Sequence, residues 1–164
     1  MASAKKAVPE GYHTITPQLT VDDAARAIDW YKKALGAEEL GRSNGPDGKI
    51  MHAELKIGDS RIFVNDPVMD GKGPKAYGGS PASLWLYVDD CDAVFKRAVT
   101  AGAQVRMPVD NQFWGDRMGA FVDPHGYSWS VATRKEDLTK EEMDLRAQEF
   151  FKAFAKKQPQ PAHT

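Results

Sequence analysis

The same pattern occurs twice along the chain. Val21-Asp22-Asp23 begins a helical stretch that ends at Gly36-Ala37, and 67 residues further on Val88-Asp89-Asp90 begins another that ends at Gly102-Ala103. A strand-like segment with alternating polarity precedes each helix, and further strand-like segments with a tight turn follow it. A unit of this size cannot bury the face of its own sheet. The repeat therefore predicts two paired modules that form a curved sheet around a cavity, and the cavity is where we expect the function.

The composition excludes several classes of function. A net charge of −1 gives no electrostatic basis for binding nucleic acid or an anionic membrane. The longest apolar runs are far shorter than the roughly 20 residues that a membrane span requires, and the first ten residues do not resemble a secretory signal. The single cysteine, Cys91, cannot form an intramolecular disulfide. We therefore expect a cytoplasmic protein with no membrane or nucleic-acid partner.

Turn-forming residues and helical patterns divide the chain into segments. We predict a disordered lead (1–10), a first module (11–66), a Gly/Pro-rich linker (67–81), a second module (82–135), an amphipathic helix (136–157) and a disordered tail (158–164). The linker is expected to be a mobile loop of the kind that covers sites. Thr139 and Glu142 form a capping box for the last helix. One face of this helix is apolar and consists of Met143, Ala147, Phe150, Phe151 and Phe154. This face either packs on its own domain or forms a dimer contact.

An ordered set of motifs resembles the vicinal oxygen chelate superfamily, which includes glyoxalase I, extradiol dioxygenases and bleomycin resistance proteins. The similarity is greatest to its PhnB-like branch. The motifs span about residues 12 to 137 and are Ala27-Ile28-Asp29-Trp30-Tyr31 with Gly36-Ala37, His52-Ala53-Glu54-Leu55 with Ile57-Gly58-Asp59, Val88-Asp89-Asp90, Trp114-Gly115-Asp116-Arg117 and Asp123-Pro124-His125-Gly126-Tyr127-Ser128-Trp129. The resemblance implies an α+β fold of two paired βαβββ modules. In this fold a curved mixed sheet surrounds a cavity, and helices cover its outer face. The resemblance also implies a homodimer. The C-terminal helix predicted above is an addition to the two modules.

Strand parity indicates which side chains face the cavity, because successive strand residues point to opposite faces. The helix-facing set includes Ile15, Leu19, Val21, Met51, Ala53, Leu55, Ile57, Leu84, Leu86, Val88, Tyr127, Trp129 and Val131. The cavity-facing set is Thr16, Gln18, Thr20, His52, Glu54, Lys56, Ser83, Trp85, Tyr87, Ser128 and Ser130. Hydroxyls, an amide, an imidazole, a carboxylate and two aromatic rings suit a small amphipathic organic ligand. A solvated sheet face is the alternative that such alternation also produces.

The resemblance also implies a test for metal. Metal-dependent members use four ligands at set strand positions, two in each module, and by motif these fall on Thr16, Glu54, Ser83 and Ser130. Only Glu54 is a competent ligand, since neutral hydroxyls bind a divalent cation weakly. No cofactor is therefore expected. If a divalent metal binds, the set would be shifted to Glu54 with His52 and Gln18.

Two further motifs bear on chemistry. His52 and Glu54 share a strand face and form a candidate proton-transfer pair, with a hydrogen bond that stabilises the sheet as the alternative. In Trp114-Gly115-Asp116-Arg117, Arg117 could hold a carboxylate and Trp114 could form one end of the pocket, although the string is also consistent with a structural role. His125 is expected to be exposed at a hairpin turn.

The leading hypothesis is a PhnB-like protein that binds a small organic molecule between its modules without metal. The proposed ligand-binding residues are Thr16, Gln18, His52, Glu54, Ser83, Trp85, Tyr87, Trp114, Arg117, Ser128 and Ser130. Whether the protein is an enzyme stays open. The alternatives are a metal-dependent lyase, isomerase or dioxygenase-like enzyme with shifted ligands, a metal-free acid–base catalyst using His52 and Glu54, and a dimeric scaffold whose terminal helix recruits a partner.

Overall fold

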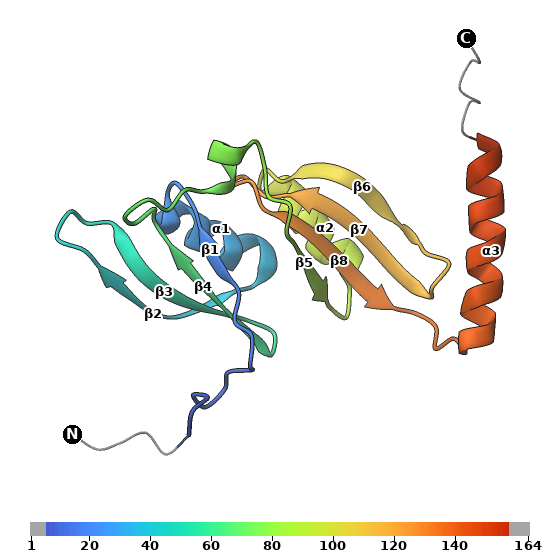
Figure 1. Cartoon of the computed structure of the whole chain (residues 1–164), viewed down its shortest axis with the longest axis horizontal. Helices are drawn as coiled ribbons and strands as arrows, with labels where there is room; N and C mark the ends of the chain where they lie inside the picture. Colours follow the sequence, from blue (N-terminus) through green and yellow to red (C-terminus); the bar gives the residue numbers. More distant parts are fainter. Residues whose placement is uncertain (1–5, 158–164) are drawn as a thin grey trace, which may run out of the picture.

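The computed structural model describes residues 6–157, and the predictions for residues 1–5 and 158–164 fall outside that part of the chain. Figure 1 shows two modules side by side along the long axis. The first comprises β1 (Gln18–Thr20), α1 (Ala24–Leu35), β2 (Glu38–Asn44), β3 (Ile50–Ile57) and β4 (Ser60–Asn65). A 3₁₀ turn, η1 (Pro74–Tyr77), lies in the linker. The second module comprises β5 (Ser83–Tyr87), α2 (Cys91–Thr100), β6 (Gln104–Asn111), β7 (Asp116–Val122) and β8 (Ser128–Arg134), and α3 (Lys140–Lys157) follows.

The two modules have the same topology. Their strand orders are β1-β4-β3-β2 and β5-β8-β7-β6, and in each the first strand pairs in parallel with the last. The other neighbouring strands are antiparallel. The α+β fold with two βαβββ modules and an additional C-terminal helix is therefore confirmed. The structure adds that the two sheets are hydrogen-bonded separately, with β1 and β5 at their edges.

Both module helices begin and end as the sequence signals predict. The carboxylate of Asp23 accepts a hydrogen bond from the backbone N–H of Arg26, and that of Asp90 accepts one from Ala93. Such caps satisfy N–H groups that have no partner within the helix. Gly36 adopts the left-handed conformation (φ 70°) that ends α1. The capping box of α3 is also present, since Thr139 and Glu142 exchange hydrogen bonds.

A single hydrophobic core extends across both modules, because α1 of the first packs against the second. The hydroxyl of Tyr31 on α1 donates to the buried carboxylate of Asp123 after β7 at 2.8 Å. The indole of Trp30 donates to the carbonyl of Ala101 at 2.8 Å, and Tyr127 donates to the carbonyl of Thr20 at 3.1 Å. These bonds fix the second module on the first and thereby determine which strands meet at their junction.

Two residues contradict the parity prediction. Ile15 is 83% exposed rather than helix-facing, because the first strand starts only at Gln18 and the preceding residues are not in a ladder. Met51 is 46% exposed because the β2–β3 register shifts between Ser43 and Asn44, so that Ile50 takes the buried position instead. Beyond this irregularity, Ala53, Leu55 and Ile57 are buried as predicted.

The helix α3 stands apart from the sheets at one end of the molecule (Figure 1). Its phenylalanines Phe150 and Phe151 contact Phe113 of the β6–β7 connection, with ring centroids 5.1 Å and 6.0 Å apart. The apolar side chains that stay exposed on it are Leu145, Phe150, Phe151 and Phe154. Within residues 6–157, none of the helices is both long enough and apolar enough to span a membrane.

Candidate functional site

A cavity of about 280 Å³ lies where the two modules meet, and we call it the seam cavity. It is bounded by the end of the β3–β4 hairpin, by β5 with Trp129 of β8, and by the segment that leads into β1. Its apolar lining residues are Ile15, Pro17, Ile57, Ile62, Leu84, Trp85, Leu86 and Trp129. Its polar lining residues are His13, Thr16, Ser60 and Arg61. An apolar enclosure with a few converging polar groups is the usual form of a small-molecule site.

Beside this cavity, a cluster of polar and aromatic side chains covers the face of the first sheet that α1 does not cover. We call this the open face. The hydroxyl of Tyr12 donates to the Oε2 atom of Glu54, and His52 Nε2 lies 3.5 Å from Oε1 of the same carboxylate. The guanidinium of Arg61 lies over the Tyr12 ring, 4.4 Å from its centroid. The rings of His52 and Phe63 are in edge contact, with centroids 4.6 Å apart. The predicted pair of His52 and Glu54 is thus brought together within a larger cluster.

The charge of Glu54 is stabilised by this cluster. The hydrogen bond from Tyr12 is the main cause that lowers the pKa of Glu54, and His52 and Arg61 act in the same direction while burial opposes them. Conversely, burial and the bond to Glu54 raise the pKa of Tyr12. Glu54 is therefore an anion at neutral pH, and Tyr12 keeps its proton.

The open face of the second sheet presents an aromatic platform. Trp85 and Tyr87 are 48% and 59% exposed, and their ring centroids are 6.1 Å apart. Across the ladder from Trp85 lie only the small residues Ser130 and Ala120. The ring of Trp85 is therefore free to contact another molecule on this face while it also lines the seam cavity. Ser83 and Ser128 pair with each other at the start of the same two strands.

The Trp114-Gly115-Asp116-Arg117 string holds the Tyr87 side chain of this platform through Asp116. The buried carboxylate of Asp116 accepts hydrogen bonds from the hydroxyl of Tyr87 at 2.8 Å and from the indole of Trp114 at 3.1 Å. Arg117, the next residue, points to the other face and binds Asp92 of α2 through two hydrogen bonds of 2.7 Å. The structure thus separates Arg117 from the proposed ligand-binding residues and assigns it a structural ion pair.

Gln18 does not join His52 and Glu54. Its side-chain amide donates to Asn65 at 2.9 Å. The register pairs Phe63 with both Gln18 and Glu54, so the phenyl ring stands between them on the same face. Among the described residues, no group of three His, Cys, Asp or Glu side chains is arranged to hold a metal ion. The shifted set of Glu54, His52 and Gln18 thus does not converge on one point.

The register also corrects one of the four ligand positions implied by the resemblance. Ser130 lies on β8, the strand that pairs with β5, so its counterpart in the first module must lie on β4, which pairs with β1. Glu54 lies on β3, and the position on β4 that matches Ser130 is Phe63. The four positions therefore hold Thr16, Phe63, Ser83 and Ser130, a set that does not fit a divalent cation.

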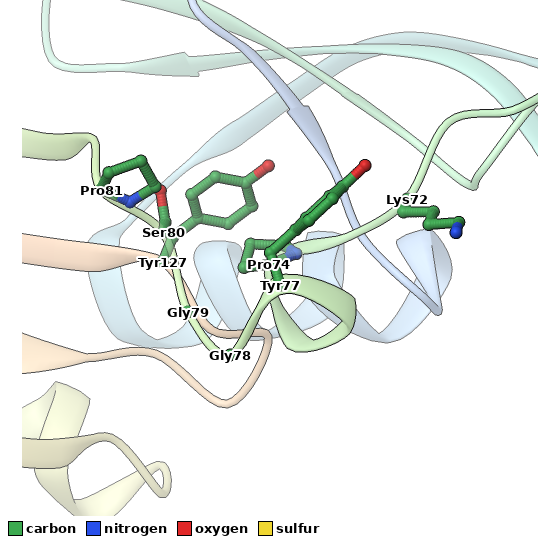
Figure 2. A pocket seen from close by; sticks show the side chains of 8 residues that line it. All are labelled: Lys72, Pro74, Tyr77, Gly78, Gly79, Ser80, Pro81 and Tyr127. Carbon is green, nitrogen blue, oxygen red and sulfur yellow. The ribbon is translucent and has the colours of Figure 1, made fainter.

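The linker forms a second hollow, of about 720 Å³, which opens widely to solvent. Figure 2 shows Tyr77 and Tyr127 projecting beside it, with Lys72 at one end and Pro81 at the other. None of the site residues predicted from the sequence lines it. Although it is larger, it lacks the enclosed apolar walls of the seam cavity, and we do not regard it as the ligand site.

Several site residues were not predicted from the sequence. Arg61 and Phe63 follow the two-residue turn after Ile57, and continuing the strand parity across that hairpin would have placed them beside Glu54. No local signal identifies Tyr12, which lies outside the strands. His125, expected to be exposed, is half-buried, and burial lowers its pKa. It faces Tyr31 at the junction rather than the seam cavity.

Comparison with known proteins gives the same fold. A family model described as the Glyoxalase/Bleomycin resistance protein/Dioxygenase superfamily matches residues 12–131. The uncharacterized protein Rv0887c of Mycobacterium tuberculosis is 45% identical over 134 residues, which cover 79% of this chain and 79% of that protein.

Two solved structures are similar to the chain over most of their length. The crystal structure of TioX from Micromonospora sp. ML1 has a TM-score of 0.60 and 27% identity, and the match covers 77% of this chain and all of TioX. A PhnB protein from Bacillus cereus, titled a putative 3-demethylubiquinone-9 3-methyltransferase, has a TM-score of 0.61 and 19% identity. That match covers 74% of this chain and 99% of the other. At that identity the second likeness supports the fold alone.

Proposed function

Because the chain belongs to the glyoxalase/bleomycin resistance protein/dioxygenase superfamily, we propose that it binds a small organic molecule in the seam cavity without a metal ion. The observation that carries this proposal is Trp85, which lines an apolar cavity and is still 48% exposed. A large aromatic side chain in such a position has contact area available for a ligand. Tyr87 extends the surface, and Thr16 and Arg61 supply polar contacts from the first module.

The chemistry of the side chains supports binding without metal. The four family positions hold two serines, a threonine and a phenylalanine, and these do not provide the imidazole or carboxylate ligands that a catalytic divalent ion requires. Glu54 already accepts a hydrogen bond from Tyr12 and lies near His52 and Arg61. We therefore assign Glu54 to organising the first sheet's open face.

A metal-free acid–base enzyme that uses His52 and Glu54 is the second candidate, since the two side chains are 3.5 Å apart on the open face. The lowered pKa of Glu54 argues against it as the general base, because a carboxylate that is stabilised as an anion is a weak base near neutral pH. Glu54→Gln should abolish turnover if this second candidate holds, and should leave the fold intact.

We also propose that the protein is a homodimer. Leu145, Phe151 and Phe154 of α3 are more than half exposed, and an amphipathic helix that leaves such residues in water gains stability from a partner. Light scattering after gel filtration measures the mass. A dimer that dissociates in Phe151→Glu/Phe154→Glu supports the assignment, and a monomer at tens of micromolar contradicts it. The buried free thiol of Cys91 is compatible with a cytoplasmic location.

The binding proposal is tested with a fragment library on chelator-treated protein. Melting temperature and tryptophan fluorescence are measured for the wild type and for Trp85→Ala. We expect compounds that raise the melting temperature and quench fluorescence with saturation in the wild type, and that do neither in the variant. Tyr77→Ala is the matched control, because Tyr77 is an exposed aromatic residue of the linker away from the seam cavity. If no compound acts on the wild type, or if Trp85→Ala responds equally, the proposal is wrong.

A further inference from the structure

We propose that the ligand of the seam cavity is a small organic anion, a carboxylate on an apolar or aromatic body, and that Arg61 binds its charged group. This inference rests on the proposed function and specifies the chemical class of the ligand. It follows from the unused donors of Arg61, from how its guanidinium is held, and from the charges that line the cavity.

The guanidinium of Arg61 has hydrogen-bond donors for which the described part of the chain offers no acceptor in hydrogen-bonding geometry. Its ion-pair partner is Oε2 of Glu54, 3.9 Å from Nη1, which is too far for a hydrogen bond. That oxygen already accepts a hydrogen bond from the Tyr12 hydroxyl. Within residues 6–157, no hydrogen bond from the Arg61 side chain is found, although only 25% of that side chain is exposed. A partly desolvated guanidinium with free N–H groups favours an anionic partner.

The surroundings of Arg61 fix its orientation. The guanidinium stacks over the ring of Tyr12, 4.4 Å from the ring centroid. Gly11 passes so close that a Cβ atom there would be 2.6 Å from Nη2, and its φ of +78° is one that glycine adopts readily. Tyr12 and Gly11 lie against the guanidinium, and Glu54 lies near its Nη1 atom. The guanidinium therefore has less rotamer freedom to lose when it binds a ligand.

The charge and size of the seam cavity agree with an anionic ligand. Arg61 is its only permanently charged lining residue in the described part of the chain, and no carboxylate lines it. Its volume of about 280 Å³ is at the lower end for ligand pockets and suits a compound with one ring. Trp85 and Leu84 provide the apolar wall for that ring.

Binding of 3-phenylpropionate, measured by calorimetry, tests the inference against its uncharged isostere 3-phenylpropionamide. We expect the carboxylate to bind at least about tenfold more tightly than the amide. Arg61→Gln should remove that preference, and Arg61→Lys should retain part of it because the charge remains. Arg42→Gln is the matched control, since Arg42 forms its ion pair with Glu39 on the outer strand of the sheet. Circular dichroism and melting temperature verify the fold of each variant.

The outcomes separate this inference from the proposed function. Equal affinity for acid and amide, or undiminished carboxylate binding in folded Arg61→Gln, overturns the anion inference while the binding proposal stands. If 3-phenylpropionate does not bind but neutral fragments bind in a manner that depends on Trp85, the anion inference is again wrong. If neither class binds and Trp85→Ala makes no difference, both fail.

Discussion

Gln18 and Glu54 lie on the same face of the first sheet, and Phe63 stands between them. Phe63 pairs with Gln18 on one side and with Glu54 on the other, so the two polar residues are on strands separated by a third. Adjacent strands are about 4.8 Å apart, which puts the backbones of Gln18 and Glu54 about 10 Å from each other. The ring of Phe63 also contacts His52. The first sheet thus presents a mixed aromatic and polar surface there rather than a ligand set.

The first prediction concerns metal content. Protein purified without chelator and soaked with nickel, zinc or manganese should retain well under one equivalent per chain after dialysis, because the family positions Thr16, Phe63, Ser83 and Ser130 offer no strong ligand. Elemental analysis makes the measurement, with Glu54→Gln as the comparison. One equivalent in the wild type that is lost in the variant would restore Glu54 as a metal ligand.

The bond from Tyr31 to Asp123 should contribute to both stability and its pH dependence. Asp123 is buried and accepts bonds from the Tyr31 hydroxyl, the Trp129 indole and the N–H groups of His125 and Tyr127. Tyr31→Phe removes one charged hydrogen bond and should lower the free energy of unfolding by about 1.5–3 kcal/mol at pH 8. Asp123→Asn should lower the free energy of unfolding further. Each carboxylate oxygen of Asp123 accepts two hydrogen bonds, and the NH₂ group of asparagine would face two of these donors with donors of its own. Urea titration measures both.

The pH dependence follows from the sign of the shift at Tyr31. Burial first, and then the charge of Asp123, raise the pKa of Tyr31 well above its ordinary value. Above about pH 10 the unfolded chain loses this proton while the folded chain keeps it, so stability falls as pH rises. In Tyr31→Phe that loss is absent. We therefore expect a shallower decline between pH 8 and pH 11 than in the wild type, and parallel curves would contradict this account.

Tyr12→Phe should raise the pKa of Glu54 toward its ordinary value, since the Tyr12 hydroxyl is the main group that lowers it. NMR of the glutamate side-chain carboxyl carbons gives the pKa directly. The stabilisation linked to this charge is present above the unfolded pKa and is lost as pH falls through the folded one, so the variant should lose it at a higher pH. Tyr77→Phe, on the exposed linker, should leave Glu54 unchanged. An unaltered Glu54 pKa in Tyr12→Phe would mean that the hydrogen bond is not formed in solution.

Packing beneath α2 gives the fourth prediction. A Cβ atom at Gly119 on β7 would lie 2.8 Å from Phe95 and 2.8 Å from Val109. Gly119→Ala should therefore lower the free energy of unfolding by about 1–3 kcal/mol through overpacking. Gly41→Ala is the control, because nothing in the described residues 6–157 lies within 4 Å of the equivalent atom on β2. Equal stability of the two variants would show that the helix can move away at little cost.

The repeat was enough to predict two paired modules, and the resemblance to the vicinal oxygen chelate superfamily added their βαβββ topology. Capping aspartates, Gly36 and the alternation in β3 depend on local chemistry, and local chemistry can be read from one segment at a time. Ile15 and Met51 deviated because a strand boundary and a register shift depend on what the neighbouring strand does. A pattern within one strand contains no information about that neighbour.

The candidate site was predicted in part. Trp85 and Thr16, which parity assigned to the cavity, line the seam cavity, but so do Ile57, Leu84, Leu86 and Trp129, which parity assigned to the helix face. Glu54 was assigned to a family ligand position that belongs to Phe63, because the assignment followed a motif and not the pairing of strands. Tyr12 reaches Glu54 from outside the ladder, across 42 residues of sequence. Contacts of that kind depend on the tertiary fold and have no local signal.

The most direct test of the central claim is the indole N–H spectrum of the four tryptophans during titration with a fragment hit in the presence of chelator. We predict that the Trp85 signal shifts with saturation. The Trp30 signal should stay in place, because its indole is bonded to the carbonyl of Ala101 away from the seam cavity. Saturable movement of Trp85 alone or with Trp129 supports a metal-free ligand site between the modules. A stationary Trp85, or movement that requires added divalent metal, would contradict it.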